Sequence, residues 1–580
     1  MAEVRTKADD FLDAIRSTGG DDLEKTAKAA GLDFKTAEKW AKQLGDLVEI
    51  SYPVNPLRKP SVKLKAPIKS HAPNISVSGG GRELERYSVV VDKVPADVVI
   101  EQSKGDVMQS YTVTMPHLGD ATALLLSNVV KEMAKSISVR TDDISNPKKA
   151  QTIKDKFQED AKKRILAEIP VTPEQVDILS GIALQRVYGL GDLDMILGDD
   201  LIEEICINSA ATPIIIYHRR HGWLKTNIMV QSEDDIFDYA SQIGRRVGKD
   251  ITNLNPLMDA RLITGDRVMA SMFPISSQGN TITIRKFARD PWTIVDFMDP
   301  AHNTISPDIA AFMWLCIQYE LSIMIAGGTA SGKTSMLNSF CAFIPPGQRV
   351  ISIEDTREIQ LPSHLSLNWI QLTTRNPNPD GLGGVSMLNL IVSSLRMRPD
   401  RIIVGEIRDR DEAEVLFEAM HTGHSVYSTM HADTCQHVRR RVTEPPIAIP
   451  EAELEALQVI VTQYRDRLHG IRKTFEVAEV VPGTTERKLE LNYLYRWRVK
   501  TDTFEAIDRS TRVYNDLNLY TGMTVKEIEA DLKEKQNVLK WLLANKLNRI
   551  HDIGRVMNMY YTDKDELMAA VNAGRAGGLR

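Results

Sequence analysis

The chain has 580 residues, 42% of them hydrophobic and 26% charged, with a formal net charge of −6 at pH 7. The length predicts roughly four domains, and the composition is that of an ordinary soluble globular protein. The slight acidic excess excludes a global basic field, so neither nucleic acid nor an anionic lipid surface is indicated as the main partner.

Cysteine usage and hydropathy narrow the class of protein further. The four cysteines are scattered singly without a Cys-x-x-Cys pair, which disfavours a zinc site or a disulfide framework and favours a reducing compartment. The first residues, MAEVRTKADD, contain no apolar stretch of the signal-peptide kind. The most apolar window, residues 310–325, includes Gln318 and Glu320, so we expect a core helix and strand there and not a membrane span.

Residues 1–65 predict three helices followed by two strands, an order that resembles a winged helix. A winged helix that reads DNA does so through its third helix, here expected over residues 34–44. That helix carries Lys35, Lys39 and Lys42, but acidic residues interrupt them, and residues 1–65 have a net charge of only +1. Because affinity for DNA depends on phosphate neutralisation, a protein-docking or structural role is favoured, with DNA binding as the alternative.

Residues 66–185 form three segments that differ in composition and in predicted secondary structure. Residues 66–83 are rich in proline, serine and glycine and predict a flexible linker, which we expect to tether the winged helix loosely. Residues 84–140 predict a small α/β domain, with alternating strands and then a helix from Asp120. Residues 141–185 are charged and helical in pattern, which indicates a connecting arm.

A second α/β domain is predicted over residues 186–298, from two paired strands, an amphipathic helix and three further strand-like runs. Arg261, Arg267 and Arg285 stand at strand ends and turns shortly before the nucleotide motif described next. They are candidates for contacting a phosphate. Any one of them taken alone is more simply a solvated surface arginine.

The strongest motif is a P-loop. An apolar run over residues 321–326 predicts a buried strand, GGTASGKT over 327–334 fits G-x-x-x-x-G-K-[ST], and an amphipathic helix is expected over 335–343. Strand, glycine-rich loop and helix in this order are the context that a P-loop requires. Lys333 is expected to reach the β- and γ-phosphates, and the Thr334 hydroxyl to ligate Mg²⁺. The residues expected to bind ATP are Gly327, Gly328, Thr329, Ala330, Ser331, Gly332, Lys333, Thr334 and Ser335.

Three later strands are each followed by an unusual polar residue. Glu354 follows an apolar strand over 350–353, Glu406 follows another over 401–404, and His431 follows a third over 425–429. Strand–helix alternation of this kind builds a parallel sheet, whose ligands lie at the carboxyl ends of its strands. These three side chains are therefore expected to converge on the phosphate held by the P-loop.

Each of the three side chains has a predicted role in ATP hydrolysis. Glu406 is expected to share Mg²⁺ with Thr334, and Glu354 to orient and deprotonate the attacking water. His431 is expected to sense the γ-phosphate; the alternative is a buried histidine with a purely structural role. A further cation is needed to neutralise transition-state charge, and an arginine from the preceding domain or from a neighbouring subunit would supply it.

Four motifs together resemble those of the type II/IV secretion system ATPase superfamily. They are the Walker A loop GGTASGKT, an Asp box ISIEDTREIQLP, a Walker B segment RPDRIIVGEIRD and a His box GHSVYSTMHA. PLMDARLITGDRVMAS and TITIRKF are similar to stretches of the archaeal branch, the motors of archaella and archaeal type IV pili. The resemblance covers about residue 84 to the C-terminus, including a helical tail over 525–573.

The resemblance implies a RecA-like ATPase domain over residues 299–510, followed by a C-terminal helical region over 511–580. It also implies a homo-hexamer at the cytoplasmic face of a membrane, using ATP and Mg²⁺. Such a motor acts through a polytopic membrane platform protein on pilin-like subunits. Arg261, Arg267 and Arg285 occupy motifs that match the family's phosphate-contacting arginines.

Two other functions are compatible with the same motifs. One is a conjugation-type secretion ATPase that moves DNA or protein. The other is a regulatory ATPase whose winged helix binds DNA. The complete catalytic set, the acidic composition and the nearly neutral winged helix favour the filament motor, and no nucleic-acid partner is expected.

Overall fold

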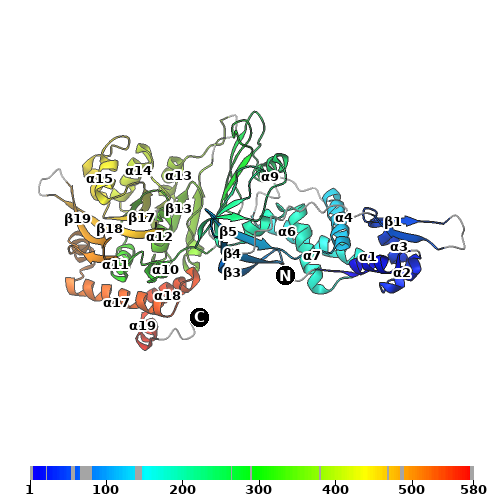
Figure 1. Cartoon of the computed structure of the whole chain (residues 1–580). Coiled ribbons are helices and arrows are strands. Elements are labelled where there is room, and N and C mark those ends of the chain that lie inside the picture. Colours follow the sequence, from blue (N-terminus) through cyan, green and yellow to red (C-terminus); the bar gives the residue numbers. More distant parts are fainter. Residues whose placement is uncertain are drawn as a thin grey trace. The chain divides into compact units, whose positions relative to one another are not determined.

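The chain divides into two compact units, Met1–Phe287 and Ala288–Arg580 (Figure 1). The computed structural model describes residues 4–20, 22–53, 59–65, 81–136, 147–262, 264–287, 290–375, 377, 381–466, 469–483 and 489–574. Most of the predicted linker, residues 66–80, lies outside the described residues. Its predicted end at residue 83 is two residues too late, because Arg82 already begins strand β3 (Arg82–Val91).

The first unit begins with three helices and a two-stranded antiparallel sheet, as the winged-helix pattern predicts. These elements are α1 (Lys7–Thr18), α2 (Leu23–Ala29), α3 (Phe34–Gln43), β1 (Val48–Ser51) and β2 (Ser61–Leu64). The helices start where side chains can cap them: Asp22 and Asp33 accept backbone N–H groups at the starts of α2 and α3.

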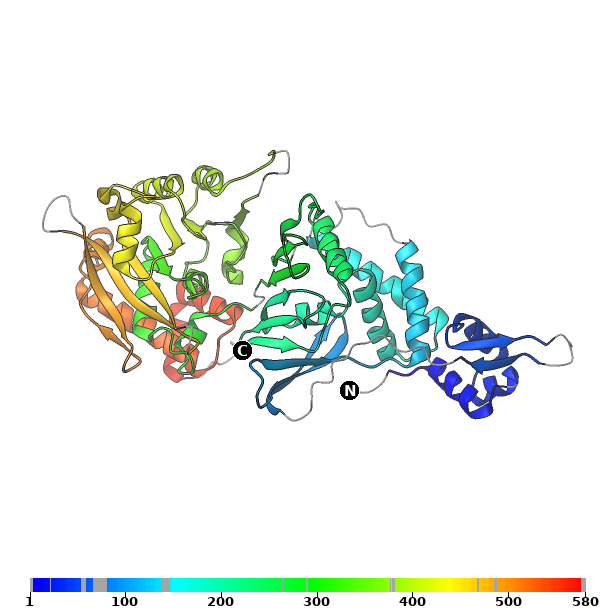
Figure 2. The same ribbon diagram turned by 45° about the horizontal axis from the view of Figure 1, so that its top comes forward.

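The winged helix packs firmly on the helices that follow it, so the expectation of a loosely tethered module is wrong. Trp40 of α3 is fully buried in one cluster with Leu125 and Ile169, and its indole Nε1 donates to the carbonyl of Glu168 at 3.0 Å. The carboxylate of Asp9 accepts the N–H of Ala121 at 2.9 Å. The dark blue helices and the light blue α4 are neighbours in Figures 1 and 2. The helices that follow are α4 (Asp120–Ser136), α6 (Pro147–Glu168) and α7 (Pro173–Val187).

A nine-stranded sheet forms the rest of the first unit, in the order β3-β4-β5-β8-β7-β6-β11-β10-β9. Neighbouring strands are antiparallel except for the parallel pair β5–β8. Helix α8 (Leu193–Gly198) precedes β6, and the buried face of α9 (Glu233–Arg246) shares a core with β9, β10 and β11. The remaining strands are β4 (Val94–Gln102), β5 (Gln109–Thr114), β6 (Ile202–Ile207), β7 (Ile215–His218), β8 (Gly222–Thr226), β9 (Leu257–Arg261), β10 (Arg267–Ser271) and β11 (Thr281–Arg285).

The second unit is built on another nine-stranded sheet, in the order β14-β13-β15-β16-β12-β17-β18-β19-β20. The strands from β14 to β17 in this order are parallel, and the rest are antiparallel. The strands are β12 (Ile323–Gly327), β13 (Val350–Glu354), β14 (Trp369–Thr373), β15 (Arg401–Val404), β16 (Ser425–Met430), β17 (Val459–Asp466), β18 (Ile471–Pro482), β19 (Leu489–Arg498) and β20 (Thr503–Ala506). The predicted α/β fold with a parallel sheet is confirmed.

Helices cover the sheet of the second unit. They are α10 (Ile294–Met298), α11 (Pro307–Gln318), α12 (Lys333–Cys341), α13 (Met387–Ser394), α14 (Arg410–His421), α15 (Cys435–Thr443), α16 (Arg512–Thr521), α17 (Val525–Ala544), α18 (Ile550–Thr562) and α19 (Lys564–Ala573). The described residues of this unit also include the 3-10 helices η1 (Ser363–Asn368), η2 (Leu395–Met397) and η3 (Glu451–Ala456). Among the helices of the described residues, we find none whose length and hydropathy would suit a membrane span.

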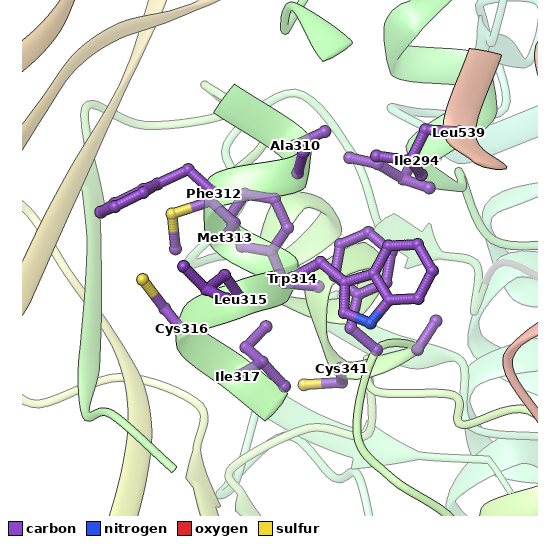
Figure 3. Close-up of a cluster of buried hydrophobic side chains, with 14 of the residues drawn as sticks. Ile294, Ala310, Phe312, Met313, Trp314, Leu315, Cys316, Ile317, Cys341 and Leu539 are labelled. Carbon is purple, nitrogen blue, oxygen red and sulfur yellow. The ribbon is translucent and has the colours of Figure 1, made fainter. Parts of the chain in front are cut away.

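The core of the second unit connects the P-loop helix to the C-terminal tail. Helix α11 is buried on nearly all sides, and Figure 3 shows its side chains in one cluster with Cys341 of α12 and Leu539 of α17. The indole of Trp314 donates to the Tyr561 hydroxyl at 2.9 Å, and that hydroxyl donates to the Phe343 carbonyl at 3.0 Å. The tail is therefore part of the core of the second unit and not an appendage.

Candidate nucleotide-binding site

The P-loop connects the end of β12 to the start of α12. Helix α12 begins at Lys333, two residues earlier than the sequence predicts. Gly332 stands at the N-cap of α12 with φ 91° and Ala330 has φ 57°, which turn the loop back on itself. No described side chain caps α12. The first N–H groups of this helix, together with its positive dipole end, are thus directed to an anion-binding position.

Lys333 lies inside the loop, with 8% of its surface exposed. Its Nζ donates to the carbonyl of Gly328 at 3.1 Å and lies 3.5 Å from Nδ1 of His431. Burial lowers the pKa of Lys333, whereas the charge of Glu406 opposes that shift. A buried ammonium group held in this way is a phosphate ligand that has already lost much of its hydration.

A chain of polar contacts runs from Lys333 along the carboxyl ends of the parallel strands. Nε2 of His431 lies 3.0 Å from Oε1 of Glu406, and Nη2 of Arg408 donates to Oε2 of the same carboxylate at 3.0 Å. Nη1 of Arg408 donates to Oδ2 of Asp355 at 2.6 Å. The contacts follow the spatial order β12, β16, β15, β13, so they need the assembled sheet.

Two members of this chain, Asp355 and Arg408, were not predicted as site residues. Both stand in the motifs quoted above, directly after Glu354 and two residues after Glu406. The sequence holds a signal for them, since a charged residue at a strand end faces the ligand edge of a parallel sheet. Their pairing depends on β13 and β15 being neighbours.

Glu354 ends β13 and is 3% exposed. Its Oε1 accepts the backbone N–H groups of Glu358 at 2.7 Å and Ile359 at 2.9 Å. Burial raises the pKa of Glu354 to about 7. The carboxyl thus fixes the start of the Asp-box loop, and its raised pKa suits proton acceptance near neutral pH. Its role as base stays a prediction.

The donor set fits magnesium bound together with nucleotide phosphates. The described residues contain no group of three or more His, Cys, Asp or Glu side chains suited to hold a metal ion. Mg²⁺ in nucleotide sites takes one or two protein oxygens and completes its shell with phosphates and water. The Thr334 hydroxyl and the Glu406 carboxylate are hard oxygen donors of that kind, and they would hold the ion that screens the phosphate charge.

A further cation, Arg472 of β18, contacts the P-loop from within the same unit. Its Nε donates to the carbonyl of Ala330 at 3.1 Å. From the sequence, such a charge was expected only from the preceding domain or from a neighbouring subunit. Arg472 was missed because β18 pairs with β17, which lies directly beside β12.

The three predicted arginines form a separate group in the first unit. Arg267 stands directly opposite Arg285 on one side and Arg261 on the other, so the three share a row across β11, β10 and β9. Arg267 also forms two hydrogen bonds with Asp259, at 2.9 and 3.1 Å. Like charges at directly opposed positions destabilise a sheet. Asp259 offsets part of this repulsion by pairing with Arg267, and the phosphate contact of the three arginines stays a prediction.

Among the comparisons with known proteins, a family model and one curated relative both name a secretion system. A family model described as type II/IV secretion system protein matches residues 224–473. Protein MJ0900 of Methanocaldococcus jannaschii, itself uncharacterised, is 35% identical over 406 residues, 68% of this chain and 71% of that protein. The type IV secretion system protein PtlH of Bordetella pertussis is 30% identical over 262 residues, 42% of this chain and 76% of that protein. The solved structure of the ATPase DotB of Yersinia pseudotuberculosis matches 63% of this chain and 92% of its own, with 18% identity and a TM-score of 0.38.

The chain belongs to the type II/IV secretion system protein family, which confirms the resemblance. Like the members of that family it is an ATPase, and its P-loop is a nucleotide-binding loop.

Proposed function

We propose that this chain is the Mg²⁺-dependent ATPase motor of a type IV pilus-like filament, a pilus or an archaellum. The main support for the residue roles in this ATPase is the series of polar contacts from Lys333 through His431 to Glu406. Lys333 and the loop from Gly327 to Ser335 hold the phosphates, and Thr334 with Glu406 provides the protein oxygens for magnesium. Glu354 accepts the proton of the attacking water.

The arginine row has a role in this proposal as the source of positive charge from outside the loop. Arg267 and Arg285, with Arg261 beside them, stabilise the charge that develops on the phosphate of a nucleotide. Replacing Arg267 or Arg285 by alanine should then lower kcat more than it weakens ATP binding.

The assembly proposed is a homo-hexamer at the cytoplasmic face of a membrane, where it acts on a polytopic platform protein and through it on pilin-like subunits. A second candidate is transport through a type IV secretion system, which the similarity to the Bordetella protein supports. Both functions use the same ATPase chemistry, and they differ in the membrane partner.

The winged helix is proposed as a docking module and not as a DNA reader. Two of the lysines on α3 are paired inside the chain: Lys39 with Glu168 at 2.6 Å, and Lys42 with Glu38 at 2.9 Å. Such lysines contribute little counterion release on DNA. Tight binding of duplex DNA by the chain at physiological salt would support the regulatory alternative instead.

The test of the ATPase site is Lys333→Ala in the purified full chain. The loss of the buried loop cation should abolish ATP hydrolysis and strongly weaken ATP binding, whereas Lys540→Ala, on an exposed position of α17, should leave both unchanged. Unchanged turnover in Lys333→Ala would refute the assignment. Light scattering with and without ATP tests the hexamer, and identification of the integral proteins that co-purify from membranes separates the filament motor from the secretion ATPase.

A further inference from the structure

Arg408 makes an unusual set of contacts for a side chain that is 60% exposed. Its Nε and Nη2 both donate to Oε2 of Glu406, at 3.1 and 3.0 Å, and its Nη1 donates to Oδ2 of Asp355 at 2.6 Å. A neighbouring arginine on the same segment, Arg410, comes only within 3.9 Å of Glu414, on its own helix. Arg408 therefore joins two strand ends, whereas Arg410 lies on the surface of α14.

The two carboxylates joined by Arg408 belong to different motifs. Asp355 follows β13 in the Asp box, and Glu406 follows β15 in the Walker B segment. Asp355 is held a second time, because its Oδ1 accepts the Thr374 hydroxyl at 3.0 Å. Arg408 thus connects a carboxylate in a fixed position to one that the nucleotide site uses.

The contacts of Glu406 divide between its two oxygens. Oε2 takes both nitrogens of Arg408, whereas Oε1 lies 3.0 Å from His431, on the side of Lys333. When one oxygen of a carboxylate accepts two hydrogen bonds from a fixed arginine, the carboxylate can no longer rotate freely about its terminal bond. Its other oxygen is then presented in one direction, toward the P-loop.

We propose that Arg408 is a positioning residue for the ATPase reaction: it holds Oε2 of Glu406 against Asp355, so that Oε1 is directed to the magnesium–nucleotide site. The inference rests on the proposed role of Glu406 as a magnesium ligand. Residues that orient a metal ligand typically change metal affinity or activity by about 10- to 100-fold when they are lost. Lysine cannot reproduce the planar fork of arginine, so it should restore the effect only in part.

The experiment compares Arg408→Ala, Arg408→Lys, Asp355→Asn and the double variant Arg408→Ala/Asp355→Asn in the full chain, with Arg410→Ala as the matched control. Binding of a fluorescent ATP analogue is titrated against Mg²⁺ at low temperature, where turnover is negligible. ATPase rates and melting temperatures are measured beside it. Arg408→Ala should raise the Mg²⁺ midpoint about tenfold and lower kcat by a similar factor. Arg408→Lys should recover part of both, and Arg410→Ala should match the wild type.

Asp355→Asn should show a smaller loss, and the double variant should be no worse than Arg408→Ala, because both changes remove the same link. Wild-type Mg²⁺ dependence and kcat in Arg408→Ala, with Lys333→Ala inactive, would overturn the inference and leave the proposed function standing. Equal losses in Arg408→Ala and Arg410→Ala, or a lowered melting temperature with an unchanged Mg²⁺ midpoint, would also overturn it. A wild-type chain that hydrolyses no ATP would remove the proposed function and the inference with it.

Discussion

At the scale of single residues, hydrogen bonding and burial shift the pKa of Glu354 in opposite directions. Its Oε1 is fixed by the N–H groups of Glu358 and Ile359, which favour the charged form. Burial disfavours that form more strongly and raises the pKa to about 7. A carboxyl in this state changes protonation within the physiological range, which an exposed glutamate does not.

The predicted consequence is a pH dependence of catalysis. If Glu354 must be deprotonated to act as base, kcat/KM should rise with pH and reach half its plateau near pH 7. Glu354→Gln should remove this rising limb of the pH profile and reduce kcat by about 10²–10⁴-fold while Mg-ATP still binds. His431→Ala serves as the control, since it should lower activity but keep the limb. A limb that persists in Glu354→Gln would assign the base elsewhere.

The same pKa predicts a stability effect of defined sign. Glutamate in the unfolded chain titrates near 4.5, below the folded value of about 7. Between these values the folded state binds more protons than the unfolded state, so the stability of the second unit should fall as pH rises through this window. Glu354→Gln should abolish that decline, and urea unfolding at pH 5 and pH 8 measures it.

At the scale of elements, the start of α16 depends on one buried carboxylate. Glu479 of β18 is fully buried and accepts the backbone N–H of Thr511 at 2.6 Å and the hydroxyl of Ser510 at 2.6 Å. The N–H groups of Arg512 and Val513 donate to it as well. Burial alone would raise the pKa of Glu479, but these hydrogen bonds outweigh it and hold the pKa below the usual range.

Glu479→Ala should therefore destabilise the second unit. Several donors would lose a charged acceptor in a buried place, which costs about 3 kcal/mol in the free energy of unfolding. Because the folded pKa is lowered, the contribution is present above the unfolded pKa and is lost as pH falls through the folded value. Urea unfolding at neutral and acidic pH measures both. Glu490→Ala, on an exposed position of β19, should have little effect, and an equal effect of the two changes would contradict this account.

The sequence predicted the elements whose pattern is local. Strands β12, β13, β15 and β16 are continuous buried runs with polar residues after them, and they lie as predicted. The edge strand β14 was missed because it is only partly buried and so lacks an apolar run. The antiparallel strands β17 to β20 were missed as well; β18 and β19 carry charged residues between apolar ones. The pairing of Arg408 with Asp355 depends on β13 and β15 being neighbours, which residue spacing does not reveal.

At the scale of the whole molecule, residues 1–65 share a core with the helices that follow them. Trp40 and Leu125 lie in one cluster, and Asp9 accepts the first N–H groups of α4. Removing residues 1–65 would expose the apolar face of α4 and leave these N–H groups without their acceptor. The winged helix thus has a structural role in the first unit, whatever partner it docks.

A chain that begins at Arg82 should consequently be less stable than the full chain and prone to associate through α4. In the full chain, Trp40→Ala should lower the free energy of unfolding of the first unit by about 3–5 kcal/mol. Lys35→Ala, on an exposed position of α3, is the control and should change little. Differential scanning calorimetry with light scattering measures both effects. A truncated chain as stable and monodisperse as the full one would show that the contact is dispensable.

Because the chain divides into two compact units, a melting experiment can show which unit binds the nucleotide. The P-loop and the polar chain lie wholly in the second unit, and the arginine row lies wholly in the first. A ligand stabilises only the folded region that binds it, by about 2.7 kcal/mol at a hundredfold excess over its Kd. ATP should therefore move the transition of the second unit upward. An equal upward shift of the first unit's transition would contradict the location of the nucleotide-binding loop in the second unit.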